Sequence, residues 1–130
     1  MPKILVVDDE PSNRAVVRAV LTPSGHDVLE ASNAEEALAV VREHRPDLVL
    51  TDLGLPAVSG ADFIKTLRDD PATADLSIAL YTGTHSSAMV RDFMALLNVR
   101  HYIQKPCEPG ELLATVEAAL QQPCDCSPPS

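Results

Sequence analysis

The sequence predicts an α/β fold in which an open, doubly wound sheet of five parallel strands carries helices on both faces. Short apolar runs alternate five times with segments whose apolar residues recur at helical spacing. The apolar runs are continuous, as in Ile4-Leu5-Val6-Val7, which is typical of parallel strands buried on both faces. Strict alternation of strand and helix then implies right-handed crossovers within one sheet.

Each expected element corresponds to one of these segments. The expected strands are Lys3–Val7, Asp27–Ala31, Leu48–Thr51, Ser77–Tyr81 and Arg100–Ile103. The expected helices are Pro11–Leu21, Asn33–Glu43, Gly60–Asp69, Ser86–Leu97 and Pro109–Gln121.

Capping residues mark the boundaries of the first two helices. Pro11 suits a first helical turn, where its missing N–H costs nothing, and the segment Thr22-Pro23-Ser24-Gly25 ends that helix. Asn33 is a favourable N-cap for the second helix, and Glu36 follows three residues later, as in a capping box. The apolar residues that then recur at helical spacing are Ala34, Ala37, Leu38 and Val41.

The later helices also have end signals, and a compositional break follows the last of them. Pro71 stops the third helix, and Asn98 can adopt the left-handed conformation that closes the fourth. The break comes at Pro123. We therefore expect one domain over residues 1–122 and a flexible tail, or the start of a linker, over residues 123–130.

Composition and charge limit the classes of function. Of the 130 residues 45% are hydrophobic, enough for a core built from Val, Leu, Ile and Ala. The 19 acidic and 10 basic residues give a net charge of −9, which opposes direct binding of nucleic acid or anionic membranes and suits a divalent cation. No stretch is apolar enough to span a bilayer, and Met1-Pro2-Lys3 leads straight into a strand without a signal peptide, which predicts a cytoplasmic protein.

The cysteines carry little functional information. Cys107, Cys124 and Cys126 are three in number and so form no paired disulfide framework. Cys124 and Cys126 could chelate a metal or pair with each other, but a mobile tail is the more common explanation of such a cluster.

Polar residues follow four of the five expected strands. Asp8 and Asp9 follow the first strand, Asp52 the third, Thr82 the fourth and Lys105 the fifth. Taken singly, each has an ordinary explanation as a cap, a turn residue or a solvated charge. Because ligands of such sheets bind at the carboxyl ends of the strands, their joint occurrence predicts a site there.

The chemistry of these groups indicates a phosphoryl acceptor. Three neighbouring carboxylates repel one another and require a cation, and a small set of oxygen ligands favours Mg²⁺. The Lys105 ammonium and the Thr82 hydroxyl could then hold the oxygens of a phosphoryl group. In this arrangement Asp52 is the nucleophile that takes the phosphoryl group.

These residues resemble those of response-regulator receiver domains over residues 3 to about 121. The matching segments are Ile4-Leu5-Val6-Val7-Asp8-Asp9-Glu10, Asp52-Leu53-Gly54-Leu55-Pro56 with Gly60, Thr82-Gly83, and Tyr102-Ile103-Gln104-Lys105-Pro106. The resemblance implies a flavodoxin-like fold with strand order 2-1-3-4-5. It also implies transfer of a phosphoryl group to Asp52 from a phosphohistidine of a sensor histidine kinase or histidine phosphotransfer protein.

The resemblance assigns further roles by position. Asp9, Asp52 and the backbone carbonyl of Gly54 would ligate Mg²⁺ directly, and Asp8 would act mainly through water, with Mn²⁺ able to substitute. Lys105 would contact the phosphoryl oxygens, and the Lys105-Pro106 peptide bond is expected to be cis.

Thr82 and Tyr102 correspond to the family's switch pair. Movement of the Thr82 hydroxyl toward the phosphoryl group would let Tyr102 turn inward and reshape the face formed by the fourth helix, fifth strand and fifth helix. The ordinary alternative is that Tyr102 is a half-buried strand aromatic. The small residues Gly54 and Thr84 stand at positions that tune hydrolysis in the family, and we expect them to leave the site open to water.

Three alternatives are weighed against this function. A phosphorylation-independent scaffold is the main rival within signalling, although no reactive group is missing here. A flavin carrier is disfavoured because Asp8-Asp9-Glu10 would repel a flavin phosphate. A haloacid-dehalogenase phosphatase is disfavoured because residue 54 is Gly where a second Asp is needed, and because Asp52 follows the third strand instead of the first.

The expected role is a regulated phosphoacceptor that catalyses only its own phosphorylation and dephosphorylation, without a separate turnover substrate. The output is not encoded in the sequence at hand. The tail favours a linker to an output domain over a single-domain regulator, and a homodimer is a further partner that the resemblance allows.

Overall fold

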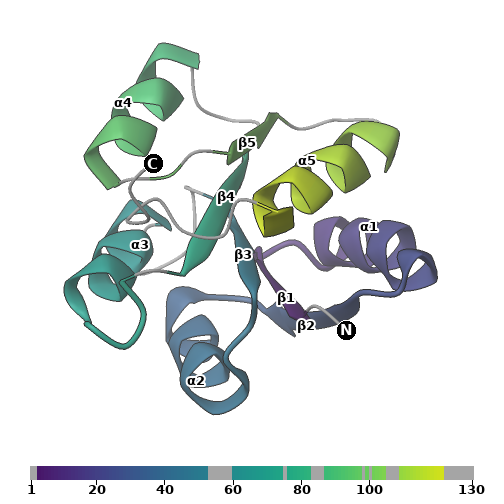
Figure 1. The fold of residues 1–130 in the computed structure, drawn as a ribbon, viewed down its shortest axis with the longest axis horizontal. Helices are drawn as coiled ribbons and strands as arrows, with labels where there is room; N and C mark the ends of the chain where they lie inside the picture. Colours follow the sequence, from purple (N-terminus) through teal and green to yellow (C-terminus); the bar gives the residue numbers. More distant parts are fainter. Residues whose placement is uncertain are drawn as a thin grey trace.

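The alternating apolar runs form one parallel sheet with helices on both faces in the computed structural model (Figure 1). Residues 3–52, 60–74, 76–82, 87–97, 99, 101–104 and 109–121 are described by it. The strands are β1 (Lys3–Val7), β2 (Asp27–Ala31), β3 (Leu48–Thr51), β4 (Ser77–Thr82) and β5 (His101–Gln104). The helices are α1 (Pro11–Leu21), α2 (Ala34–His44), α3 (Gly60–Asp69), α4 (Ser87–Leu97) and α5 (Pro109–Gln121), with a short 3₁₀ helix η1 (Thr22–Ser24) after α1.

The strand order is β2-β1-β3-β4-β5, and all four neighbouring pairs are parallel. This confirms both the doubly wound α/β class and the order that the resemblance implied. The chain leaves β1 toward β2 on one side and later returns to β3 on the other, so the direction of winding reverses between β1 and β3. In open sheets of this kind the crevice outside the carboxyl ends of two such strands is where ligands bind.

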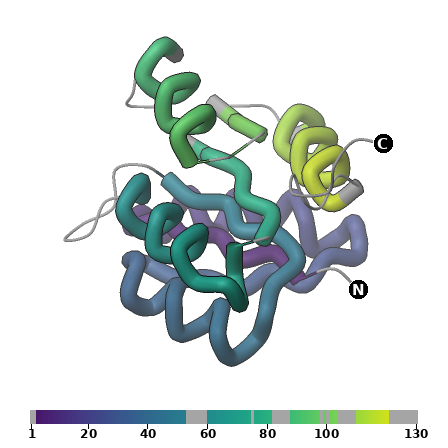
Figure 2. Tube along the Cα trace, turned by 60° about the vertical axis from the view of Figure 1, so that its left-hand side comes forward, coloured from purple at the N-terminus to yellow at the C-terminus, as the bar shows by residue number. Residues whose placement is uncertain are grey.

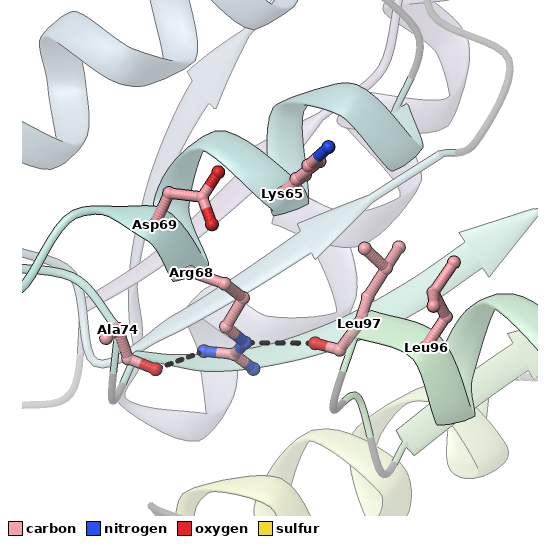
Figure 3. A pocket seen from close by; sticks show the side chains of 6 residues that line it. All are labelled: Lys65, Arg68, Asp69, Ala74, Leu96 and Leu97. Atoms are coloured by element: carbon pink, nitrogen blue, oxygen red, sulfur yellow. Dashed lines mark hydrogen bonds between the residues drawn. The ribbon is translucent and has the colours of Figure 1, made fainter.

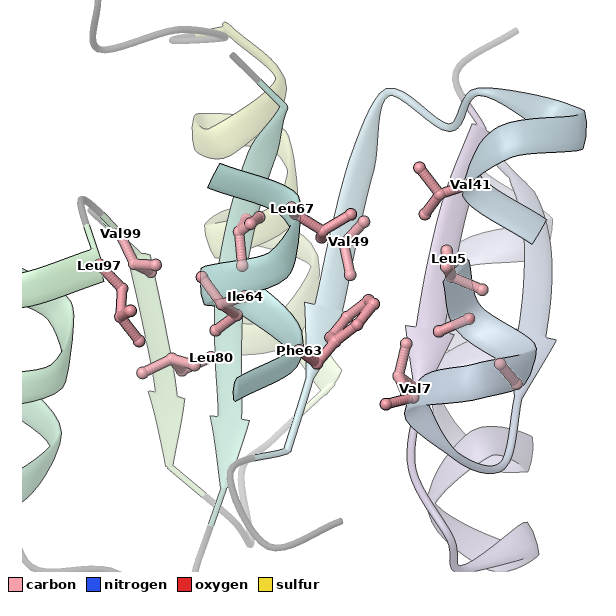
Figure 4. Packing of buried hydrophobic residues seen from close by; sticks show 14 of the residues in the cluster. Leu5, Val7, Val41, Val49, Phe63, Ile64, Leu67, Leu80, Leu97 and Val99 are labelled. Atoms are coloured by element: carbon pink, nitrogen blue, oxygen red, sulfur yellow. The ribbon is translucent and has the colours of Figure 1, made fainter. Parts of the chain in front are cut away.

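Side chains of each strand alternate between the two faces of the sheet, and each face has its own buried cluster. On β1, Leu5 and Val7 belong to the cluster covered by α2, α3 and α4, whereas Ile4 and Val6 belong to the cluster covered by α1 and α5. Figure 4 shows the first cluster, in which the α3 side chains of Phe63, Ile64 and Leu67 lie among strand residues. The buried sheet explains why its strands are apolar throughout.

Most of the expected boundaries are confirmed, with small corrections. β4 was expected to end at Tyr81 but includes Thr82, and β5 was expected to end at Ile103 but includes Gln104, because Thr82 pairs with Gln104 at the end of the ladder. Helix α2 starts at Ala34 and ends at His44, one residue later at each end than expected, because Asn33 is its cap. Ser86, Asn98, Arg100 and the tail over residues 123–130 lie outside the described residues.

The capping box of α2 is present in a modified form. The Asn33 side-chain oxygen accepts a hydrogen bond from the Glu36 N–H at 2.8 Å, as expected. The Glu36 carboxylate accepts from the Ser32 N–H at 2.8 Å and from the Ser32 hydroxyl at 2.7 Å, one residue earlier than in the usual box. These bonds, the backbone one first, lower the pKa of Glu36.

Figures 1 and 2 place β5 between α4 and α5 at one end of the sheet, with α1 and α2 toward the other end. Within the described ranges no helix has the length and apolar character needed to cross a membrane.

Candidate functional site

The predicted acceptor and the acidic pair lie at the reversal point of the sheet. Asp8 and Asp9 directly follow β1, and Asp52 directly follows β3, its neighbour in the sheet. The Asp52 N–H donates to the Val7 carbonyl at 3.2 Å, and the Asp8 N–H donates to the Ala31 carbonyl at 3.1 Å. The backbones of both residues are therefore held by neighbouring strands one residue past the strand ends.

Asp8 is a buried acid with several backbone contacts. It is 1% exposed, and its Oδ1 accepts a hydrogen bond from the Glu10 N–H at 3.0 Å. Its carbonyl accepts a hydrogen bond from the Arg14 Nη1 at 2.6 Å. A carboxylate this deeply buried is stabilised only where such partners replace water.

Asp9 and Asp52 are more accessible than Asp8. Asp9 is exposed, and Asp52 is half-buried beside the fully buried Thr51. The Thr51 hydroxyl donates to the Asp52 carbonyl at 3.1 Å, which adds a second restraint on the Asp52 backbone. The arrangement combines one buried acid with two acids that a ligand can reach.

The donor set at this edge suits magnesium chemically. Among the residues that the structure describes, no group of three or more His, Cys, Asp or Glu side chains is arranged to hold a metal. Mg²⁺ sites in proteins commonly use only one or two carboxylates, together with carbonyl oxygens and water. Oxygens from Asp9 and Asp52 fit this requirement, and the Gly54 carbonyl, the third predicted ligand, lies outside the described residues.

The other predicted site residues are described only in part. Thr82 ends β4 and pairs with Gln104, but its hydroxyl lies outside the described part of the chain. Thr84, Lys105 and Pro106 lie wholly outside the described residues. Their predicted roles and the predicted cis peptide bond therefore stay predictions.

Tyr102 lies on β5, where it pairs with Leu80 of β4. Its ring is half-buried and packs against the cluster covered by α2, α3 and α4. Its phenol oxygen is buried and has no hydrogen-bond partner among the described residues. Because a buried hydroxyl without a partner costs free energy, this position of the Tyr102 side chain carries an energetic penalty.

Sequence reasoning missed an ion-pair network next to Asp8. Glu30 of β2 accepts hydrogen bonds from the Arg14 Nε at 3.1 Å and from the Arg18 Nε at 2.7 Å. Arg14 and Arg18 are four residues apart on α1 and so share one helix face. The four-residue spacing of the two arginines could have indicated a shared acidic partner. That this partner is Glu30 depends on the pairing of β2 with β1, which the sequence pattern does not give.

Two surface pockets lie away from these residues. A pocket of about 450 Å³ between α3 and the end of α4 is lined by Lys65, Arg68, Asp69, Ala74, Leu96 and Leu97 (Figure 3). A pocket of about 470 Å³ lies between the end of α2 and the turn before β4, and includes Arg42, Arg45 and Asp70. Neither is lined by a predicted site residue, and both lie toward the amino ends of the strands.

Sequence comparison decides the family. The sequence model of the response regulator receiver domain matches residues 4–117. The chain belongs to the response regulator receiver domain family. Receivers are the signal-accepting domains of two-component systems, and this one has the fold expected of them.

The relatives of this receiver include longer proteins and proteins of nearly the same length. It is 34% identical over 119 residues to the phosphate regulon transcriptional regulatory protein PhoB of Pseudomonas aeruginosa, which covers 92% of this chain and 52% of PhoB. It is 32% identical to the protein PilH of the same species, covering 92% of this chain and 98% of PilH. The receiver thus spans about half of PhoB but nearly all of PilH.

Solved structures agree with this assignment. The chemotaxis response regulator CheY4 of Vibrio cholerae superimposes with a TM-score of 0.84 at 28% identity, covering 92% of this chain and 98% of CheY4. The structural similarity therefore extends over most of the chain.

Proposed function

We propose that this receiver is a phosphorylation-dependent switch in which Asp52 accepts a phosphoryl group from a phosphohistidine of a histidine kinase or phosphotransfer protein. The observation that carries the proposal is the hydrogen bond from the Asp52 N–H to the Val7 carbonyl at 3.2 Å. This bond sets the predicted acceptor beside the strand that delivers Asp8 and Asp9. Family membership supports the same assignment.

The proposed step is a phosphoryl transfer between two nucleophiles. A carboxylate oxygen of Asp52 forms a bond to phosphorus while the bond between phosphorus and the donor's ring nitrogen breaks, and the ring nitrogen keeps the electron pair. The donor's second ring nitrogen carries a proton, so the products are an acyl phosphate on Asp52 and a neutral imidazole on the donor. When bound, Mg²⁺ supplies positive charge that offsets the charge on the transferred oxygens.

The residues of the chain would act mainly through position. Asp9 and Asp52, the two more accessible acids, would hold the cation, while Asp8 is fixed by its Glu10 contact and would act through water. Lys105 would balance the phosphoryl charge, as expected from its place after the fifth strand. No turnover substrate is required, so the receiver would be a regulated phosphoacceptor.

The proposed output is a shift in the population of two arrangements of Thr82 and Tyr102. The two residues lie on adjacent strands near the site, since Thr82 pairs with Gln104 and Leu80 with Tyr102. The buried Tyr102 oxygen without a described partner supports a side chain whose preferred position can change. Such a change would alter the surface of α4, β5 and α5, which lie side by side (Figure 2).

The partners and the cellular setting are part of the proposal. A cytoplasmic histidine kinase or phosphotransfer protein would be the donor. PhoB is named a transcriptional regulator, and a DNA-binding response regulator, MtrA, is also among the relatives. An output domain joined to the carboxyl end of the receiver is therefore one architecture, and PilH, of nearly the same length, represents the other.

Intact-mass spectrometry after incubation with acetyl phosphate tests the proposal. A gain of one phosphoryl group is expected in the presence of Mg²⁺ and absent without it. Asp52→Asn should abolish the gain, whereas Asp27→Asn, which changes an exposed acid at the amino end of β2, should not. A wild-type protein that gains no mass under any condition would instead act as a phosphorylation-independent scaffold.

A further inference from the structure

We propose that Arg14 is a positioning residue that holds the turn after β1 in the shape from which Asp9 binds the cation and Asp8 acts through water, and that Glu30 keeps Arg14 in place. This inference rests on the function proposed above. The observations that carry it are the contacts of one guanidinium group with two different strands.

Arg14 is largely buried and is held at two points. Its Nη1 donates to the Asp8 carbonyl at 2.6 Å, and its Nε donates to the Glu30 Oε1 at 3.1 Å. The side chain is only 17% exposed. Because the guanidinium is planar and rigid, two bonds in different directions fix its orientation.

The carbonyl that Arg14 binds belongs to the peptide unit that joins Asp8 to Asp9. A peptide unit is planar, so fixing its carbonyl also fixes the direction in which the chain continues to Asp9. The Asp8 N–H is bound to the Ala31 carbonyl, and its side chain to the Glu10 N–H. Arg14 therefore supplies the restraint on the carbonyl side of this turn.

Glu30 is suited to hold Arg14 in its charged, oriented state. Partial burial acts to raise the pKa of Glu30, but hydrogen bonds from Arg18 and Arg14 outweigh it and lower the pKa below its ordinary value. The carboxylate is thus ionised at neutral pH and offsets the charge of Arg14. The positive charge of Arg14 beside the acidic turn is therefore balanced by Glu30.

Arg18 provides a matched control within the same network. It binds the other Glu30 oxygen, with its Nε at 2.7 Å from Oε2, but its second backbone contact is the Val28 carbonyl at 3.4 Å. Its side chain is 52% exposed. Replacing Arg14 or Arg18 removes one positive charge and an ion pair with Glu30, but of the two arginines it is Arg14 that donates to the Asp8 carbonyl.

The first test is the Mg²⁺ dissociation constant of the unphosphorylated protein, measured from the NMR shifts of the Asp8 and Asp9 amides. The second is the Mg²⁺ dependence of phosphorylation by acetyl phosphate. Arg14→Ala should weaken Mg²⁺ binding by about 10-fold or more, as is usual when a residue that orients a metal ligand is removed. Coulomb's law alone predicts the opposite sign, because loss of a cation near acids should tighten the binding of Mg²⁺. Arg18→Ala should leave the constant within about 2-fold of wild type.

The control variants decide between positioning and general damage. Thermal melts of Arg14→Ala and Arg18→Ala, recorded without Mg²⁺, show whether each variant is folded. If Arg14→Ala does not fold, Arg14→Lys keeps the charge and one of the two bonds, and it should still weaken Mg²⁺ binding several-fold. The inference is overturned if the Arg14 variant that folds binds Mg²⁺ as tightly as wild type, or if Arg18→Ala weakens binding equally.

Failure of the proposed function is a separate result. A folded wild-type protein that neither binds Mg²⁺ nor gains a phosphoryl group contradicts the function itself. A wild-type protein that does both, with an Arg14→Ala variant that is unchanged, contradicts only the role of Arg14.

Discussion

Replacing Arg68 with alanine should lower the stability of the receiver by detaching the end of α4. The guanidinium of Arg68 lies between α3 and α4 and donates to three backbone carbonyls. Figure 3 shows the bonds to the Ala74 and Leu97 carbonyls. Its Nε is 3.1 Å from the Leu97 carbonyl, at the last residue of α4, and its Nη1 is 2.9 Å from the Ala74 carbonyl and 2.6 Å from that of Leu76. One side chain thus connects α4 to the turn before β4.

The expected magnitude follows from these three bonds. A hydrogen bond to a charged group contributes about 1.5–3 kcal/mol, and partial exposure of Arg68 lets water replace some of what is lost. We expect Arg68→Ala to reduce the free energy of unfolding by about 3 kcal/mol. For a domain of this size that corresponds to a fall in Tm of about 10 °C.

Urea unfolding followed by circular dichroism measures this difference. Lys65→Ala is the matched control, because Lys65 is exposed on the same helix and makes no hydrogen bond within the described part of the chain, and it should change stability by less than about 0.5 kcal/mol. Arg68→Lys keeps the charge but cannot reach all three carbonyls, so it should fall between the two. An Arg68→Ala variant as stable as Lys65→Ala would refute this account of how α4 is held.

Two further predictions concern the caps and ion pairs. Asn33→Ala removes the side-chain oxygen that accepts a hydrogen bond from the Glu36 N–H and should lower the free energy of unfolding by about 1 kcal/mol. Asn33→Gly should lower it by only a few tenths of a kcal/mol. Equal melting temperatures for the two variants would contradict this prediction. Glu30→Gln should lower stability at pH 7 by at most about 1 kcal/mol, since the pair is partly exposed. The folded-state pKa of Glu30 lies below its ordinary value of 4.5. The contribution of Glu30 to stability is therefore complete above pH 4.5 and is lost as the pH falls through the lowered pKa. Wild type and Glu30→Gln should accordingly converge in unfolding experiments at low pH.

The fold could be predicted from the sequence because its signals are local. The alternation of apolar runs, Pro11 at a helix start and Asn33 at a cap depend only on near neighbours, and the structure confirms each. The errors at β4 and β5 arose because the ends of strands are set by pairing, as in the pair of Thr82 with Gln104. The extra helix η1 likewise depends on Gly25, whose φ of 92° closes it.

The candidate site could be predicted only in part. The positions of Asp8, Asp9 and Asp52 follow from the order of strands, and the structure places all three at the reversal point of the sheet. Arg14 and Arg68 were missed because their partners are backbone carbonyls on other elements, Asp8 and Leu97 among them. A carbonyl is present at every residue, so no sequence pattern distinguishes the one that an arginine will bind.

The two backbone bonds beyond the strand ends bear on the entropy of ligand binding. Ordering the backbone of one residue costs about 1–2 kcal/mol. The Asp8 N–H and the Asp52 N–H are bound to the carbonyls of Ala31 and Val7 in the folded chain, so this cost is met when the domain folds. Preorganisation of this kind leaves more of the interaction energy available as affinity. The backbone at the acidic half of the candidate site is thus already ordered in the folded domain.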